Sequence, residues 1–196
     1  MEMIRVKFTG INPLLINNPQ QVDPFNKFAK ASKLITGKRK KTDEDLLALR
    51  DIEIESKVYF DDHLKIWVPS TWIMALISGV SFKKAKIAKK DIRSAVFMTE
   101  NKLKLSYAGD NKVKTITDIV KNEDFHVTLN LKQGQVRVCK AAPIFNDWSF
   151  ETCIEFDDTI INESELKDLL VYGAKYGGLG DFRPTYGRAN VEFLEV

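Results

Sequence analysis

The residues from 148 onward constrain the fold of this chain more than any other segment. Apolar and polar residues alternate over 148–156, which predicts a strand with one buried face. Asn162 and Glu165 have the spacing of a capping box, which predicts a helix that begins just after Asn162. The helix is expected to end before the glycine-rich segment 177–188, which leads to a last strand over 189–196. The pattern therefore predicts strand, helix, glycine loop and strand in this order.

The earlier residues supply the other elements of an α+β fold. Residues 3–9 alternate as a half-buried strand does, and Thr42 is expected to cap a helix that follows it. The remaining predicted elements are a helix in 24–36, hairpins over 57–68 and 126–140, a buried helix over 71–80, short strands at 94–98 and 103–107, and a loop over 108–124. This order approximates β-α-β-β-α-β, the ferredoxin-like or RRM-like order. We expect one domain spanning 1–196, with insertions at about 20–57 and 80–125.

The charge is unevenly distributed along the chain. Residues 1–100 contain 18 Lys and Arg against 12 Asp and Glu, whereas residues 101–196 contain 12 against 15, which gives the net charge of +3. The basic first half favours an anionic partner, and a solvated lysine-rich surface is the alternative.

The composition also narrows the class of protein. No apolar run approaches the roughly 18 residues of a membrane span, and the start MEMIRVKF lacks a signal-peptide pattern. Only two Cys (Cys139 and Cys153) and two His are present, without a C-x-x-C pair, so we expect reduced, packed cysteines and no metal site. We therefore expect a cytoplasmic protein without a cofactor or a membrane partner.

The loop GGLGDFRPTYGR at 177–188 is the segment most suited to binding. Glycines allow close approach of a ligand, successive amides form anion-binding concavities, and arginines bind phosphate in a bidentate way. The candidate nucleic-acid-binding residues of this loop are Gly177, Gly178, Gly180, Phe182, Arg183, Tyr186, Gly187 and Arg188, with the two aromatic residues as stacking platforms. The alternative is a helix cap followed by tight turns, with Arg183 paired to Asp181. The loop matches neither the P-loop nor the dinucleotide fingerprint.

Other basic residues are weaker candidates for phosphate contacts. Lys38, Arg39, Lys40 and Lys41 form a run between two predicted helices, and Arg137 and Lys140 lie on a predicted strand. Solvated loops and surfaces are the alternatives. For the cluster Lys83, Lys84, Lys86, Lys89, Lys90 and Arg93 we favour a solvated helix face. His63 and His126 match no catalytic motif, so we expect no catalytic residue.

Three segments together resemble the RAMP superfamily, the RRM-like subunits of CRISPR effector complexes and the related repeat-processing endoribonucleases. The first is YGGLGDFRPTYGRANV, and the second is IWVPSTWIMAL at 66–76. In the second segment Pro69, Ser70, Ile73, Ala75 and Leu76 match, whereas Thr71 and Met74 depart from the pattern. The third is the start RVKFTGINPLLI. The stretches DPFNKFAKASKLITGKRKKTDED and KAAPIFNDWSFE look like those of uncharacterised bacteriophage proteins with the same ending.

The resemblance implies an RRM-like core that binds single-stranded DNA or RNA by contacts to the nucleic-acid backbone, and it does not imply catalysis. It also implies a phage-type single-strand-binding protein that assembles along the strand, in a bacterial or phage-infected cell, with a protein partner in replication, recombination or defence. Two alternatives stay open. One is a protein-interaction module that mimics or blocks a defence effector subunit, which the modest charge of +3 would suit. The other is a metal-independent endoribonuclease that uses His63 or His126.

Overall fold

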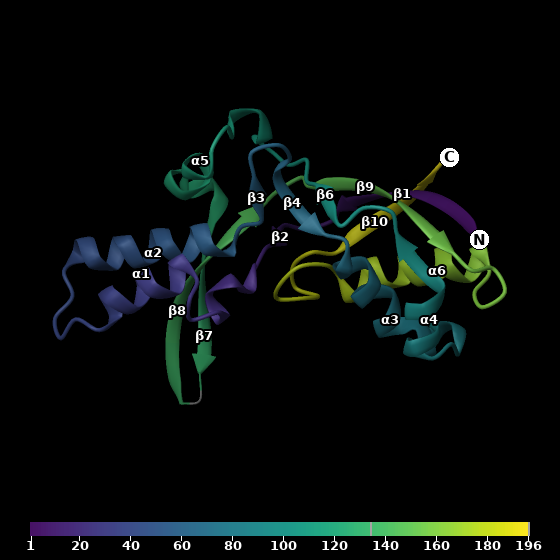
Figure 1. Cartoon of the computed structure of the whole chain (residues 1–196), viewed down its shortest axis with the longest axis horizontal. Coiled ribbons are helices and arrows are strands. Elements are labelled where there is room, and N and C mark those ends of the chain that lie inside the picture. The colour runs from purple at the N-terminus through teal and green to yellow at the C-terminus, as the bar shows by residue number, and fades with distance from the viewer. Residues whose placement is uncertain (134, 196) are drawn as a thin grey trace. The chain divides into compact units, whose positions relative to one another are not determined.

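The computed structural model describes residues 1–133 and 135–195, and the side chains of 131–133 and 136–138 lie outside the described part. Its elements are those of an α+β protein with antiparallel sheets (Figure 1). The chain divides into two compact units. Unit 1 comprises Met1–Leu15, Ile66–Asp110 and Phe145–Val196, and unit 2 comprises Ile16–Lys65 and Asn111–Ile144.

Unit 1 is built on a four-stranded antiparallel sheet in the order β10-β1-β9-β5. Its strands are β1 (Glu2–Gly10), β5 (Val96–Met98), β9 (Ser149–Phe156) and β10 (Ala189–Leu194). Arg5 lies opposite Cys153 on one side and Leu194 on the other. In chain order, the strands are therefore arranged fourth, first, third and second. Ile4, Val6 and Phe8 are buried, which makes the alternation in β1 that of a sheet with one covered face.

Helices cover that buried face of the unit 1 sheet (Figure 1). They are α3 (Thr71–Ala85), α4 (Lys89–Ala95) and α6 (Glu163–Tyr172), and α6 continues into the π-helical turn η4 (Gly173–Gly177). The capping box predicted at Asn162 and Glu165 is present. The short strands β2 (Leu14–Leu15), β4 (Lys65–Pro69) and β6 (Lys102–Lys104) complete unit 1, and β4 pairs with β6. The core includes Val6, Phe8, Ile73, Ile77, Ile154, Phe156, Leu166, Leu169 and Leu170.

Unit 2 combines a pair of helices with a long β-hairpin. The helices are α1 (Lys27–Thr36) and α2 (Asp43–Lys57), and Thr42 caps α2 with a capping box. The hairpin consists of β7 (His126–Gln133) and β8 (Val136–Phe145). The smaller elements are η1 (Pro19–Val22), β3 (Phe60–Asp61), α5 (Ile116–Lys121) and η3 (Glu123–Phe125), while η2 (Asp110–Lys112) lies at the boundary of the two units.

The helix in 24–36, the helix capped by Thr42, the buried helix after Ser70 and the strands at both ends are confirmed. Residues 108–124 were expected to form a loop, but α5 lies within them, capped by Thr115 and Asp118. The insertion expected at about 20–57 falls within the first segment of unit 2, whereas residues 80–110 belong to unit 1. Gly134, expected in the hairpin turn, lies outside the described residues.

Candidate nucleic-acid interface

The glycine loop is held by tight backbone packing inside unit 1. Gly178, Gly180 and Gly187 have positive φ angles of 74°, 72° and 73°, which side-chain-bearing residues rarely adopt. A Cβ on Gly187 would lie 1.8 Å from the Leu179 carbonyl oxygen, and one on Gly180 would lie 2.3 Å from the Leu15 carbonyl oxygen. These glycines are therefore required for the folding of the loop against the segment that follows β1.

Most amides of the loop donate hydrogen bonds to acceptors in the loop itself or elsewhere in unit 1. The Leu179 amide donates to the Gly187 carbonyl (2.7 Å), and the Gly187 amide donates to the Pro13 carbonyl (2.9 Å). The amides of Gly178, Asp181, Phe182, Tyr186 and Arg188 also donate to acceptors within unit 1. The loop therefore does not present these amides as an anion-binding concavity, which corrects the role expected for them from sequence.

Asn12 fixes the position of the loop with both ends of its side-chain amide. Its Nδ2 donates to the Thr185 carbonyl (2.7 Å), and its Oδ1 accepts from the Arg188 amide (2.8 Å). The Asn12 carbonyl in turn accepts from Nε1 of the fully buried Trp148 (2.8 Å). The loop is thus attached to the core, and the exposed side chains on it are pre-positioned. The sequence indicated only a break in regular structure at Asn12-Pro13.

The side chains that the loop exposes are those at its tip. Phe182, Arg183, Pro184 and Thr185 are exposed, whereas Tyr186 and Arg188 are half-buried. Phe182 has a positive φ of 53°, and the Arg183–Pro184 peptide bond is cis. Of the residues expected to bind, the arginines and the aromatic residues are therefore accessible, while Gly178 and Gly187 are buried.

Beside the loop, a hollow of about 300 Å³ is lined by Lys175, Tyr176, Pro184, Thr185 and Arg188. A second hollow of about 500 Å³ lies between the end of α3 and α6, and its lining includes Lys84, Lys86, Tyr172, Lys175 and Tyr176. Since Lys175 and Tyr176 line both, the two hollows adjoin. We call the two hollows together the tyrosine groove, and its defining residues are Lys84, Lys86, Tyr172, Lys175, Tyr176 and Arg188.

The two tyrosines of the groove lie side by side and carry cations on their faces. Their ring centroids are 4.8 Å apart, because residues four apart on a helix project from the same side. The Lys84 ammonium lies 3.9 Å from the centroid of Tyr172, and that of Lys175 lies 5.7 Å from the centroid of Tyr176. Tyr176 is 57% exposed, so its ring is accessible to a ligand.

The groove also contains carboxylates on the side formed by α6. Glu165 and Asp168 line the larger hollow, and the Glu165 side chain accepts a hydrogen bond from the Asn162 amide (3.2 Å) as part of the capping box. Lys84, Lys86, Lys175 and Arg188 outnumber these two acids. The groove therefore has a positive balance, with the aromatic surface between its cations.

The other predicted basic residues belong to unit 2. Lys38 forms an ion pair with Asp45 (2.6 Å), and that contact lowers the pKa of Asp45 below its usual value. Arg39, Lys40 and Lys41 are exposed in the connection between α1 and α2. Arg137 and Lys140 lie on β8, so neither belongs to the four-stranded sheet that contains β1; the side chain of Arg137 is outside the described part.

The uncovered face of the four-stranded sheet differs from the tyrosine groove. Arg5 and Lys7 on β1 lie 2.9 Å and 3.8 Å from carboxylate oxygens of Glu151 on β9. These cations already have an acidic neighbour, and Glu155 and Glu192 are on the same face by the register of the strands. The sheet face therefore has a less positive balance of charge than the tyrosine groove.

The two histidines are not part of the unit that contains the groove. His63 and His126 both belong to unit 2. His126 Nε2 lies 2.9 Å from the Ile119 carbonyl oxygen, which makes this nitrogen the protonated one, and partial burial lowers the pKa of the ring. Among the described residues, no three His, Cys, Asp or Glu side chains are grouped closely enough to hold a metal ion.

No family model and no curated protein matches this sequence. No helix in the described part of the chain is both long and apolar enough to cross a membrane.

The groove residues that sequence reasoning missed are Lys84, Lys86, Tyr172, Lys175 and Tyr176. For Lys84 and Lys86 the sequence pattern favours a solvated helix face. A signal was present in the i, i+4 pair of tyrosines with a lysine between them, immediately before the glycine loop.

Proposed function

We propose that this protein binds single-stranded nucleic acid without catalysis, and that the strand follows the tyrosine groove of unit 1. The observation that carries the proposal is that two hollows share Lys175 and Tyr176, so that an accessible ring has cations on both sides of it. Arg183 at the loop tip adds a further exposed cation beside Pro184.

The chemistry of the groove suits a single strand better than a duplex. Lysine and arginine neutralise phosphates, whereas a tyrosine ring binds the face of a base that has no stacking neighbour. Bases in a duplex are already stacked, so the ring would contribute little to duplex binding. Stacking and backbone contacts tolerate many sequences, so we expect weak sequence preference.

The topology of unit 1 supports a ferredoxin-like core of the RAMP type as part of this proposal. The chain order β1, then α3 and α4, β5, β9, α6 and β10 follows the β-α-β-β-α-β pattern, and the strands are arranged in the order fourth, first, third, second. In the sequence, the end of α6 and the glycine loop then fall between the third and the fourth strand, and both contribute residues to the groove.

Fluorescence anisotropy with labelled 30-nucleotide single-stranded DNA, single-stranded RNA and duplex DNA tests the proposal. We expect salt-sensitive binding of the single strands, with weaker binding of the duplex. The variants Lys175→Ala, Arg188→Ala and the pair Arg183→Ala/Arg188→Ala should each weaken binding of the single strands. Binding should persist in EDTA, and the RNA should remain intact.

A matched control lies on the uncovered face of the sheet. The pair Arg5→Ala/Lys7→Ala removes the same number of cations from unit 1 but lies outside the groove, so it should leave affinity nearly unchanged. Absence of binding at low salt would refute the proposed function. If the sheet-face pair weakened binding and the groove variants did not, the site would be wrong.

A further inference from the structure

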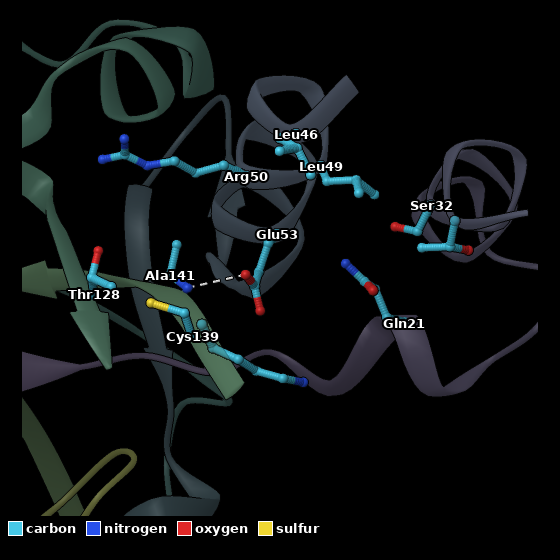
Figure 2. A pocket seen from close by; sticks show the side chains of 11 residues that line it. Gln21, Ser32, Leu46, Leu49, Arg50, Glu53, Thr128, Cys139 and Ala141 are labelled. Carbon is cyan, nitrogen blue, oxygen red and sulfur yellow. Dashed lines mark hydrogen bonds between the residues drawn. The ribbon is translucent and has the colours of Figure 1, made fainter. Parts of the chain in front are cut away.

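Unit 2 contains a separate hollow of about 460 Å³ between its helices and its hairpin (Figure 2). Leu46, Leu49, Arg50 and Glu53 of α2 line it on one side, with Ser32 of α1 across from them. The hairpin contributes Thr128, Cys139, Lys140 and Ala141, and η1 contributes Gln21. All of these residues belong to unit 2, so the hollow is independent of the tyrosine groove.

The acid in this hollow is already neutralised. One oxygen of Glu53 is 2.9 Å from the Lys57 ammonium, and the other accepts a hydrogen bond from the Ala141 amide (3.0 Å), as Figure 2 shows for Ala141. The cations of the lining are Arg50 and Lys140. Arg50 lies 3.7 Å from the highly exposed Glu123, and its Nη2 lies 3.4 Å from Nδ1 of His126. The hollow therefore favours a negatively charged occupant.

The apolar part of the hollow is aliphatic. Leu46 is 53% exposed although it lines the hollow with Leu49, and none of the described lining residues is aromatic. Stacking of bases requires rings, which the tyrosine groove has and this hollow lacks. An aliphatic surface beside cations and hydroxyl groups is instead complementary to a peptide that carries carboxylates next to a leucine-sized side chain.

Other apolar side chains of the same unit are left uncovered. Val22, Phe25 and Leu34, at 83%, 79% and 78%, are the most exposed of the large apolar side chains in the described residues. Leu47, next to Leu46, is 59% exposed. The surface of unit 2 therefore includes exposed apolar area of the kind that binding of another protein buries.

We propose that the hollow of unit 2 binds an acidic peptide segment of a partner protein, with an aliphatic side chain placed on Leu46 and Leu49 and carboxylates near Arg50 and Lys140. The protein would then hold a nucleic-acid strand with one unit and a partner with the other. The peptide site contains none of the residues that define the tyrosine groove, but it includes Lys140, which the sequence analysis named as a weaker candidate for a phosphate contact.

Fluorescence polarisation with the full chain tests this site. The probe is a labelled nonapeptide of six Asp and three Leu, compared with peptides in which Lys replaces Asp or Ser replaces Leu, and with a nine-nucleotide single-stranded DNA as competitor. We expect binding of the Asp/Leu peptide alone among the three, without displacement by the DNA. Leu46→Glu and Lys140→Glu should each weaken it at least about fivefold, because each places a negative charge beside the peptide carboxylates.

Two exposed neighbours provide matched controls. Leu47→Glu and Lys41→Glu make the same chemical changes in unit 2 outside the lining, so they should leave peptide affinity within about twofold of the original. Failure of the Asp/Leu peptide to bind, equal binding of the Lys/Leu peptide, or equal loss in the control variants would overturn the proposal. Amide chemical shifts should change at Leu46, Leu49 and Ala141 when peptide is added.

Discussion

The tyrosine groove of unit 1 and the hollow of unit 2 differ in the residues that line them. The groove has two tyrosines with lysines over their rings, whereas the hollow has two leucines and no described aromatic residue. Both have a positive balance of charge. Charge alone would therefore favour the same kind of ligand at both sites, and our two proposals differ because the apolar residues of the sites differ.

The two regions also differ in how their binding residues are positioned. The groove depends on a turn whose glycines contact backbone atoms directly, and Asn12 anchors that turn. The hollow depends on the Glu53–Lys57 pair and its bond to the β8 backbone. A substitution in one region should therefore change binding at that region and leave binding at the other unchanged.

The largest effect is expected for Gly187→Ala. The added Cβ would meet the Leu179 carbonyl oxygen, and the positive φ adds strain, so we expect a loss of about 3 kcal/mol or more in unfolding free energy. Chemical denaturation measures it. Gly177→Ala is the matched control, because nothing lies within 4 Å of its added Cβ, and its stability should change little. Equal loss in both variants would contradict the packing described for the turn.

Tyr176→Ala should weaken single-strand binding about tenfold. Base stacking on an aromatic ring contributes about 1–3 kcal/mol, and this ring is largely exposed, so its removal should cost affinity without unfolding the protein. Anisotropy titration measures the affinity. Phe97→Ala, which removes an exposed ring from β5, should have no effect, and the Asp/Leu peptide should bind both variants as before.

The salt dependence of single-strand binding should fall in the pair Lys84→Gln/Lys175→Gln. Each lost phosphate contact lowers the slope of log affinity against log salt by about 0.7, so we expect a decrease of about 1.4. Titrations at four salt concentrations measure the slope. The pair Lys104→Gln/Lys112→Gln lies outside the groove and should keep the original slope; a decrease there would mean that charge acts over the whole surface.

The smallest effect is a pH dependence of stability at His126. Because partial burial lowers the pKa of this ring below 6.5, the unfolded chain binds the proton more readily. The contribution is therefore present above pH 6.5 and is lost as the pH falls below that value. We expect His126→Gln to reduce the difference in unfolding free energy between pH 7.5 and 5.0 by about 1 kcal/mol or less. An unchanged difference would show that other groups cause it.

Local patterns in the sequence predicted most of the elements but not their grouping into units. The alternation in 3–9 and 148–156 and the caps at Thr42 and Asn162 are short-range signals, and the structure confirms them. The division into two units depends on which distant segments pack together, and the hydrophobic periodicity of a segment does not predict its distant contacts. The helix α5 was missed because its six residues give too short a pattern.

Only part of the candidate site could be predicted from the sequence, because its arrangement also depends on contacts between segments that are distant in the sequence. The glycine loop could be recognised from its composition. Its amides, however, donate hydrogen bonds to the carbonyls of Pro13 and Leu15, which are far away in the sequence. The lysines at the end of α3 looked like a solvated face because their proximity to Tyr172 arises only when α3 packs beside α6.

The pairing of β1 with β10 has a consequence for synthesis. Arg5 lies opposite Leu194, so the first strand cannot gain this neighbour until nearly every residue of the sequence has left the ribosome. Residues 175–188, which complete the groove, are also made late. A nascent chain would then expose this edge of β1 until residues 189–194 have emerged, and the groove would be completed only after residues 175–188 have been made.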